Sequence, residues 1–195
     1  FLFLNYKKET LSVIKRSGLY AFLAGILMST SFVAYIIAMT ETTVANVVFI
    51  ISTQTIFLAL FGYLFLKEKI SLKNFLSIIL AVIGIVIMVG DSLSTGSLYG
   101  DLIALLIPIN FAALILIIRK YPKVDLVPSL LYAGLLSCSY GYFMSKTILV
   151  SAHDLYIAFL IGTFQHAFGF IAITIGARTT PAVMVGILML TETLF

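Results

Sequence analysis

The stretch SFVAYIIAMTETTVANVVFIISTQTIF, residues 31–57, returns 138 residues later as GFIAITIGARTTPAVMVGILMLTETLF, residues 169–195, and the two align without a gap. Eight of the 27 aligned positions are identical, including the Thr-x-Thr-x-Phe run that ends both copies. The identical pairs are Phe32/Phe170, Ala34/Ala172, Ile37/Ile175, Thr42/Thr180, Val47/Val185, Thr53/Thr191, Thr55/Thr193 and Phe57/Phe195. Self-similarity at a fixed spacing indicates an internal repeat.

The sequence around these copies is too apolar for a water-soluble domain. Hydrophobic residues make up 62% of the 195 positions and charged residues 10%, whereas soluble domains carry about 25% charged residues. Several apolar runs reach the length of about 20 residues that a bilayer-spanning helix needs. The composition therefore predicts an all-α, polytopic membrane protein with lipid as its surroundings.

Long apolar runs separated by polar breaks predict seven membrane helices. They cover about residues 18–39, 43–66, 72–89, 98–118, 126–144 and 155–177, and a seventh begins at 181. Ser17 and Asp154 are expected to cap the first and the sixth of them. The copies begin in the first and sixth helices, five helices apart, and an odd number makes them cross the membrane in opposite directions.

Inverted repeats of this kind are the architecture of secondary transporters. We expect a fragment of a chain of roughly 280 to 300 residues, with about ten helices and five in each repeat.

Eleven of the twelve Lys and Arg residues lie in alternate loops of this arrangement. The positive-inside rule places those loops in the cytoplasm and the chain in the cell (plasma or inner) membrane. The cytoplasmic segments are the one before the first helix and the loops between helices two and three, four and five, and six and seven. Their basic residues are Lys7, Lys8, Lys15, Arg16, Lys67, Lys69, Lys73, Arg119, Lys120, Lys123 and Arg178.

Polar side chains near the middle of the predicted helices are the candidates for substrate binding, because such groups normally face a cavity or a partner. They are Gln54, Asn110, His166 and Glu192, with Tyr35 added from the first helix. Gln54 and Glu192 occupy aligned positions of the two copies. Glu192 is predicted to act as a counter-charge for the substrate or as a proton carrier, with His166 as its partner.

Each of these residues also has a structural interpretation. His166 lies on one face with Gly162 and Gly169, where small residues permit a close helix crossing. Asn110 stands near Pro108 and would satisfy backbone groups that a proline kink leaves free. Tyr35 would pack or anchor at an interface.

Four short motifs resemble EamA-type proteins of the drug/metabolite transporter superfamily. The sequence LKEKIS at 66–71 resembles the LGERLS signature that closes the fourth helix of that family, and TETLF at 191–195 is similar to its Glu-Pro-x-Phe stretch in the ninth. Gly100-Asp101 and Arg119-Lys120 resemble the opening and close of its sixth helix. In the first motif, Glu68 stands between Lys67 and Lys69 and is expected to form a water-accessible ion pair near the amino end of the helix over 72–89.

The chain also departs from the family. Lys67 replaces a glycine of the signature, and Thr55 and Thr193 replace the mid-helix prolines. The loss of these prolines leaves a kinked central helix in question, although threonine can bend a helix by bonding back to a carbonyl.

The resemblance implies ten helices around a central cavity and transport of amino acids or related metabolites by alternating access. It assigns residues 1–91 to the end of the first EamA repeat (helices three to five) and 98–195 to a truncated second repeat (helices six to nine). The implied partners are a small-molecule solute and the lipid bilayer, with no nucleic acid; coupling to protons and a homodimer stay open.

Alternative functions are a nucleotide-sugar or phosphate-sugar exchanger of the same superfamily and a non-transporting, receptor-like seven-helix protein. An exchanger for phosphate groups would need Lys or Arg in the cavity, and here these residues lie in loops and at helix ends. No nucleophile–base set indicates an enzyme, no cofactor is implied, and the lone Cys138 excludes a Cys-based metal site.

Overall fold

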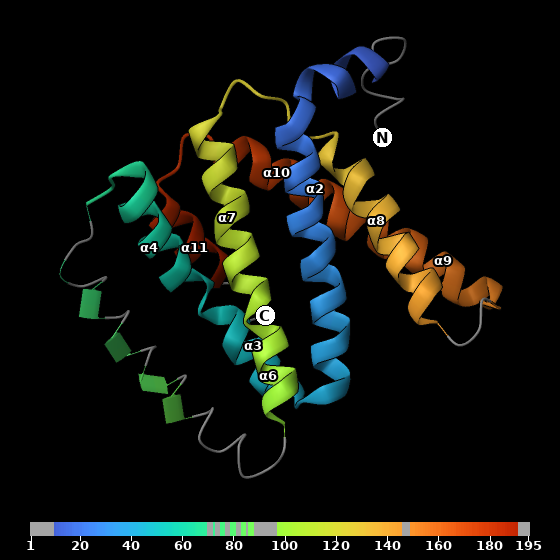
Figure 1. Cartoon of the computed structure of the whole chain (residues 1–195), viewed down its shortest axis with the longest axis horizontal. Coiled ribbons are helices and arrows are strands. Elements are labelled where there is room, and N and C mark those ends of the chain that lie inside the picture. The colour runs from blue at the N-terminus through green and yellow to red at the C-terminus, as the bar shows by residue number, and fades with distance from the viewer. Residues whose placement is uncertain are drawn as a thin grey trace.

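The computed structural model describes residues 10–69, 72, 75–76, 79–80, 83–84, 86–87, 97–145 and 149–190. Over these residues the regular structure is entirely helical (Figure 1), which confirms the predicted all-α class. The helices are α2 (Thr10–Glu41), α3 (Val44–Ser52), α4 (Gln54–Leu66), α6 (Leu98–Ala104), α7 (Leu106–Lys120), α8 (Ser129–Met144), α9 (Ala152–Leu160), the π-helical segment η2 (Ile161–Ala167), α10 (Phe168–Gly176) and α11 (Ala182–Leu190).

Four helical stretches within the described ranges are long and apolar enough to cross a bilayer. They are Ser12–Glu41, Val44–Leu66, Leu98–Lys120 and Ala152–Gly176. They correspond to the first, second, fourth and sixth predicted helices, so the polytopic membrane class is confirmed. Most of the helix predicted over 72–89, and the continuation of the last helix beyond residue 190, lie outside the described residues.

The helix predicted to begin at 126 begins three residues later. Residues 126–128 form a turn instead, in which Ser129 N–H bonds to the Leu126 carbonyl at 2.9 Å and Leu130 N–H bonds to that of Val127 at 3.2 Å. The helix that follows, α8, is therefore 16 residues long, slightly less than the usual length of a membrane span.

Both predicted caps were wrong, for reasons that the hydrogen bonds make clear. Ser17 donates to the carbonyl of Ile14 at 3.0 Å and so serves the turn before the kink at Gly18, where φ is 53°. Ser151 caps α9 instead of Asp154: its hydroxyl accepts from the Asp154 N–H at 3.1 Å and donates to the Asp154 carboxylate at 2.7 Å. Asp154 thus occupies the first turn, where an acidic side chain complements the helix dipole.

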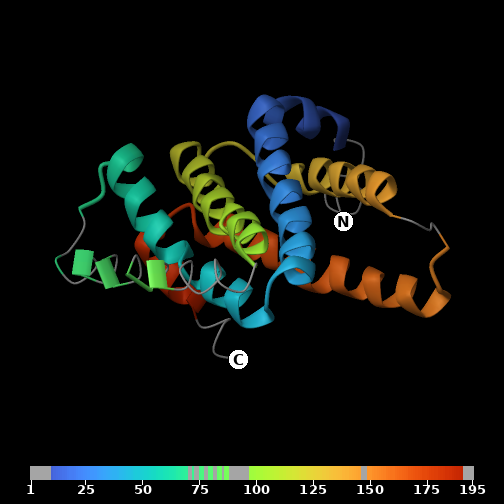
Figure 2. The same ribbon diagram turned by 60° about the horizontal axis from the view of Figure 1, so that its bottom comes forward.

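The helices are arranged around α2 and α7, which lie side by side (Figure 1). α8 packs on the other side of α2, and α4 on the other side of α7, with α11 against α4. The long helix formed by α9, η2 and α10 crosses behind α2, as the rotated view in Figure 2 also shows. Small residues lie at two of the crossings, Gly25 between α2 and α8 and Gly186 between α11 and α4, as expected where lipid supplies no hydrophobic force between helices.

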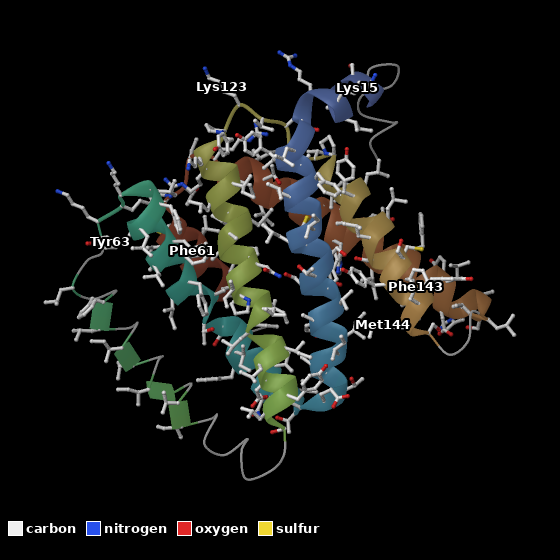
Figure 3. The ribbon with its side chains drawn as sticks, viewed as in Figure 1. Lys15, Phe61, Tyr63, Lys123, Phe143 and Met144 are labelled. Atoms are coloured by element: carbon white, nitrogen blue, oxygen red, sulfur yellow. The ribbon has the colours of Figure 1, made fainter. Side chains whose placement is uncertain are left out.

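One end of the bundle collects the start of α2 and the ends of α4 and α7. The rings of Tyr20 on α2 and Tyr121 after α7 lie 4.1 Å apart, and Figure 3 shows Lys15 and Lys123 at this same end. We call it the basic end. The opposite end holds the end of α2 and the start of α6, where Gly100 lies against Glu41 and Thr42.

At the basic end, Lys67 reverses the chain after α4. Its φ of 57° and ψ of 31° are left-handed, and the next amide, of Glu68, bonds to the Gly62 carbonyl at 3.0 Å. This C-terminal conformation usually belongs to glycine. The structure thus explains why the related signature has a glycine where this chain has Lys67.

Lys67→Gly is expected to stabilise the protein by about 1 kcal/mol, because glycine adopts the left-handed conformation without the cost that a side chain imposes. The measurement is the thermal unfolding midpoint in detergent. Lys69→Gly removes the same charge without a left-handed φ and serves as the control; an equal or lower midpoint for Lys67→Gly than for this control would contradict the account.

The crossing of α2 and α8 gives a second prediction. A Cβ at Gly25 would lie 2.5 Å from the Tyr132 Cβ and 3.1 Å from the Ser129 carbonyl oxygen, whereas one at Gly134 would meet nothing within 4 Å. Gly25→Ala should therefore destabilise the protein by about 1–3 kcal/mol through overpacking. Gly134→Ala, the matched control, should be neutral or slightly stabilising, and similar midpoints for the two variants would disprove the close crossing.

Candidate transport site

The Val44–Leu66 span is interrupted near its middle, at Thr53. The Thr53 N–H bonds to the Ile50 carbonyl at 3.0 Å, and the Ile56 N–H bonds to the Thr53 carbonyl at 2.8 Å, so the backbone changes to three-residue spacing. The Thr53 hydroxyl also donates to the Ile50 carbonyl at 2.6 Å. The α-helical hydrogen bonding is therefore interrupted without a proline, while the Thr53 backbone stays right-handed (φ −70°, ψ −5°). Thr53, two residues before the position in question, provides the side-chain bond that accompanies this interruption.

Gln54 is the first residue after this break and is only 6% exposed. Beside it, Thr55 packs against α11: a Cβ at Gly186 would lie 2.9 Å from the Thr55 Cα. The Thr55 hydroxyl is buried and has no hydrogen-bond partner among the described residues. Glu192, the aligned counterpart of Gln54, lies outside the described residues, so a Gln54–Glu192 site stays a prediction.

Asn110 connects two helices. Its side-chain amide on α7 donates to the Thr30 hydroxyl on α2 at 2.9 Å, so the interpretation that it serves the Pro108 kink was wrong. The proline acts one turn earlier. α6 ends at Ala104, four residues before Pro108. A proline ring clashes with the carbonyl of the residue four positions earlier, so the end of α6 is where Pro108 is expected to disrupt the helix.

His166 lies in η2 and faces the protein on one side. Its ring centroid is 4.9 Å from that of Phe32 on α2, and its Nδ1 is buried without a hydrogen-bond partner in the described part of the chain. A Cβ at Gly162 or Gly169 would meet nothing within 4 Å, so no described helix crosses at these glycines. π-helical turns are rare and occur frequently at functional sites, and η2 lies within the Ala152–Gly176 membrane span.

The predicted residues fall on two sides of α2. Thr30, which binds Asn110, and Phe32, which touches His166, are two residues apart and so point roughly 200° apart around the helix. Tyr35 follows Phe32 by three residues and shares its side of α2, where it is 41% exposed. His166 and Tyr35 therefore belong to one side of α2, and Asn110 belongs to the other.

The sequence interpretation missed a contact that joins three helices at the basic end. Glu68 forms an ion pair with Arg119 at the end of α7, and its Oε2 accepts the backbone N–H of Ala182, at the start of α11, at 3.2 Å. Glu68 does form an ion pair, but its partner is Arg119 and not a neighbouring lysine, and the helix amino end beside it is that of α11. The Glu68 and Lys67 motif was visible in the sequence, whereas Arg119 and Ala182 are too distant along the chain for any local signal.

A second polar contact joins the helices at the opposite end. Asp101, 1% exposed, accepts from the Thr42 hydroxyl at 2.6 Å and from the Asn46 side-chain amide at 3.3 Å. It ties α6 to the turn between α2 and α3. The sequence held two indications of this contact, but it did not show that they belong together. Gly100-Asp101 resembles the start of the family's sixth helix, and Thr42 is identical in the two copies of the repeat.

The Asn110–Thr30 bond can be measured with a double-mutant cycle of Asn110→Leu and Thr30→Val. Hydrogen bonds between membrane helices average about 0.6 kcal/mol and reach about 1.7 kcal/mol, so we expect a coupling energy in that range from unfolding in mixed micelles. Additive effects of the two substitutions would show that Asn110 does not depend on Thr30.

Comparison with known proteins agrees with this architecture. Residues 1–90 match the EamA-like transporter family. Over 90 residues the chain is 31% identical to a protein of Methanothermobacter thermautotrophicus described as an uncharacterized transporter, an alignment that covers 45% of this chain and 26% of that relative. No solved structure matches the chain significantly. The family match over residues 1–90 agrees with the motif resemblance, and this part of the chain is similar to EamA-like transporters.

Proposed function

We propose that this chain forms part of a secondary transporter that carries amino acids or related small metabolites across the cell membrane by alternating access. The observation that carries the proposal is the interruption of an apolar membrane span at Thr53, with the buried Gln54 directly after it. Broken backbone at membrane depth is tolerated where it is buried in protein or lines a cavity. Discontinuous helices near the midplane form the substrate sites of many secondary transporters.

The contact between α4 and α11 supports an inverted repeat. Residues 44–57 and 182–195 are aligned in the two copies, and the helices they begin touch at Thr55 and Gly186. α4 ends at the basic end and α11 starts there, because Glu68 lies within hydrogen-bond distance of the Ala182 amide. α11 aligns with α3, the first part of the Val44–Leu66 span, and it thus runs in the direction opposite to that span, as inversion requires.

In this proposal the basic end faces the cytoplasm, and the solute binds where the two copies meet. Gln54 would hydrogen-bond the solute, and Glu192 would neutralise its amino group or exchange a proton. His166 and Tyr35 would contact the solute from the side formed by α2 and η2. Because Asn110 bonds to Thr30 on the other side of α2, its role is to position α2 against α7.

The proposal is tested by uptake of pooled radiolabelled amino acids into liposomes that contain the full-length protein, with an imposed pH gradient. Glu192→Gln and Gln54→Leu should each reduce uptake about tenfold or more, since a hydrogen bond to a charged group contributes about 1.5–3 kcal/mol. Leu60→Ala is the control, because Leu60 lies on the exposed side of α4 and should leave uptake unchanged.

Uptake by the unmodified protein no greater than that of empty liposomes would contradict the proposed substrate class. Normal, gradient-dependent uptake by Glu192→Gln would remove Glu192 from the mechanism while leaving transport itself intact.

A further inference from the structure

The Glu68 contact lies directly above the junction of α4 and α11. A Cβ at Gly62 would lie 3.0 Å from the Glu68 Oε2 and 3.4 Å from the Ala182 Cβ, so the two helices already touch at the basic end. They touch again at Thr55 and Gly186, two turns deeper along α4 and one turn deeper along α11. The pair is therefore closed from the basic end down to the level of Gln54, and one carboxylate is bonded to both sides of that closure.

Glu68 also fixes the closure to a third helix. Its ion pair with Arg119 connects the end of α4 to the end of α7, while the Ala182 amide connects it to α11. The carboxylate complements the positive end of the α11 dipole. Removing this one charge would therefore release three helix ends together.

The polar contacts at the two ends of the bundle differ in their access to water. The Glu68 and Arg119 side chains are each 19% exposed, whereas Asp101 is 1% exposed. Water can solvate the separating charges of a partly exposed pair, so such a pair opens at little cost. Separating a buried carboxylate from its donors leaves it without compensation, which makes the Asp101 contact the permanent one.

From this geometry we propose that Glu68 holds the gate at the basic end: α4 and α11 separate there, and the Gln54 level becomes accessible, only when Glu68 releases Arg119 and the Ala182 amide. The inference rests on the proposed function, because a gate requires a site that opens to either side. It names Glu68 and Arg119 as positioning residues that act through the helices and touch no solute.

The test measures which side of the membrane reaches Thr55. The full-length protein carries Cys138→Ser and Thr55→Cys, and a membrane-impermeant maleimide is added to one face at a time in oriented vesicles. Glu68→Gln and Arg119→Gln should raise the labelling rate from the basic-end face about tenfold, within the usual 5–150-fold range of coupling between sites. Labelling from the opposite face should fall, because one population replaces the other.

Two control variants separate a gate from general loosening. Lys69→Gln removes a neighbouring charge outside the contact and should not change either rate, and Arg119→Lys keeps the charge and should retain most of the protection. Faster labelling from both faces in Glu68→Gln would identify a purely structural contact and overturn the inference, as would unchanged labelling.

This experiment requires no substrate, so its failure is distinct from failure of the proposed function. Unchanged labelling together with normal amino acid uptake would reject the gate and leave the transporter. Reciprocal labelling without uptake of any pooled amino acid would retain the gate and reject the substrate class. If Glu68→Gln does not yield folded protein, the Arg119→Gln and Arg119→Lys pair decides the question by the same criterion.

Discussion

The structure depends on one constraint: lipid offers no hydrogen-bond partner, so every backbone group freed by a helix break must be satisfied within the protein. One helix break and two helix starts in the described residues follow this constraint. At Thr53 the chain changes to three-residue spacing and adds a hydroxyl bond. At the start of α9 the Ser151 hydroxyl takes the free amide of Asp154. At the start of α11 the free amide of Ala182 donates to the carboxylate of Glu68, which follows the end of α4.

The same constraint divides the bundle into fixed and adjustable contacts. Some contacts are made by a glycine against the backbone of another element, and they leave no room for rearrangement of side chains. Gly25 of α2 lies against α8 in this way, and Gly100 of α6 lies against the turn between α2 and α3. They join α2 to α6 and α8. The contact between α4 and α11 also uses a glycine, Gly186, but at the basic end it is completed by a partly exposed carboxylate. The helices expected to move are thus the ones whose closure depends on a charge that water can reach.

The sequence predicted those features that arise from local physical properties. The length of an apolar run determines whether a helix spans a bilayer, so the four described spans were found. Three lie within three residues of their predicted bounds, whereas the first begins at Ser12 and not at 18, because the helix continues across the kink at Gly18. Pro108 was a local signal for the end of α6 at Ala104. The sequence interpretation used Pro108 only to explain Asn110, as a residue that would bond to backbone groups freed by the kink. The break at Thr53 was left open, because threonine bends helices only in some contexts.

Contacts between distant residues were beyond the sequence. Asn110 and Thr30 are 80 residues apart, and Glu68 and Ala182 are 114 apart; neither composition nor periodicity indicates which helices become neighbours. The candidate site was predicted as one polar region, but α2 stands between Asn110 and His166. Asn110 contacts Thr30 and His166 contacts Phe32, and two residues that are two positions apart on a helix point in nearly opposite directions. Glu192 lies outside the described residues, and its role stays a prediction.

The inverted repeat is tested most directly by the sidedness of two aligned positions, Glu41 and Thr179, which are both exposed. Each is replaced singly by cysteine in the full-length protein carrying Cys138→Ser, and intact cells are treated with an impermeant maleimide. The account predicts that the cysteine at 41 is labelled at once and the cysteine at 179 only after the membrane is permeabilised. Labelling of both positions from the same side would contradict it.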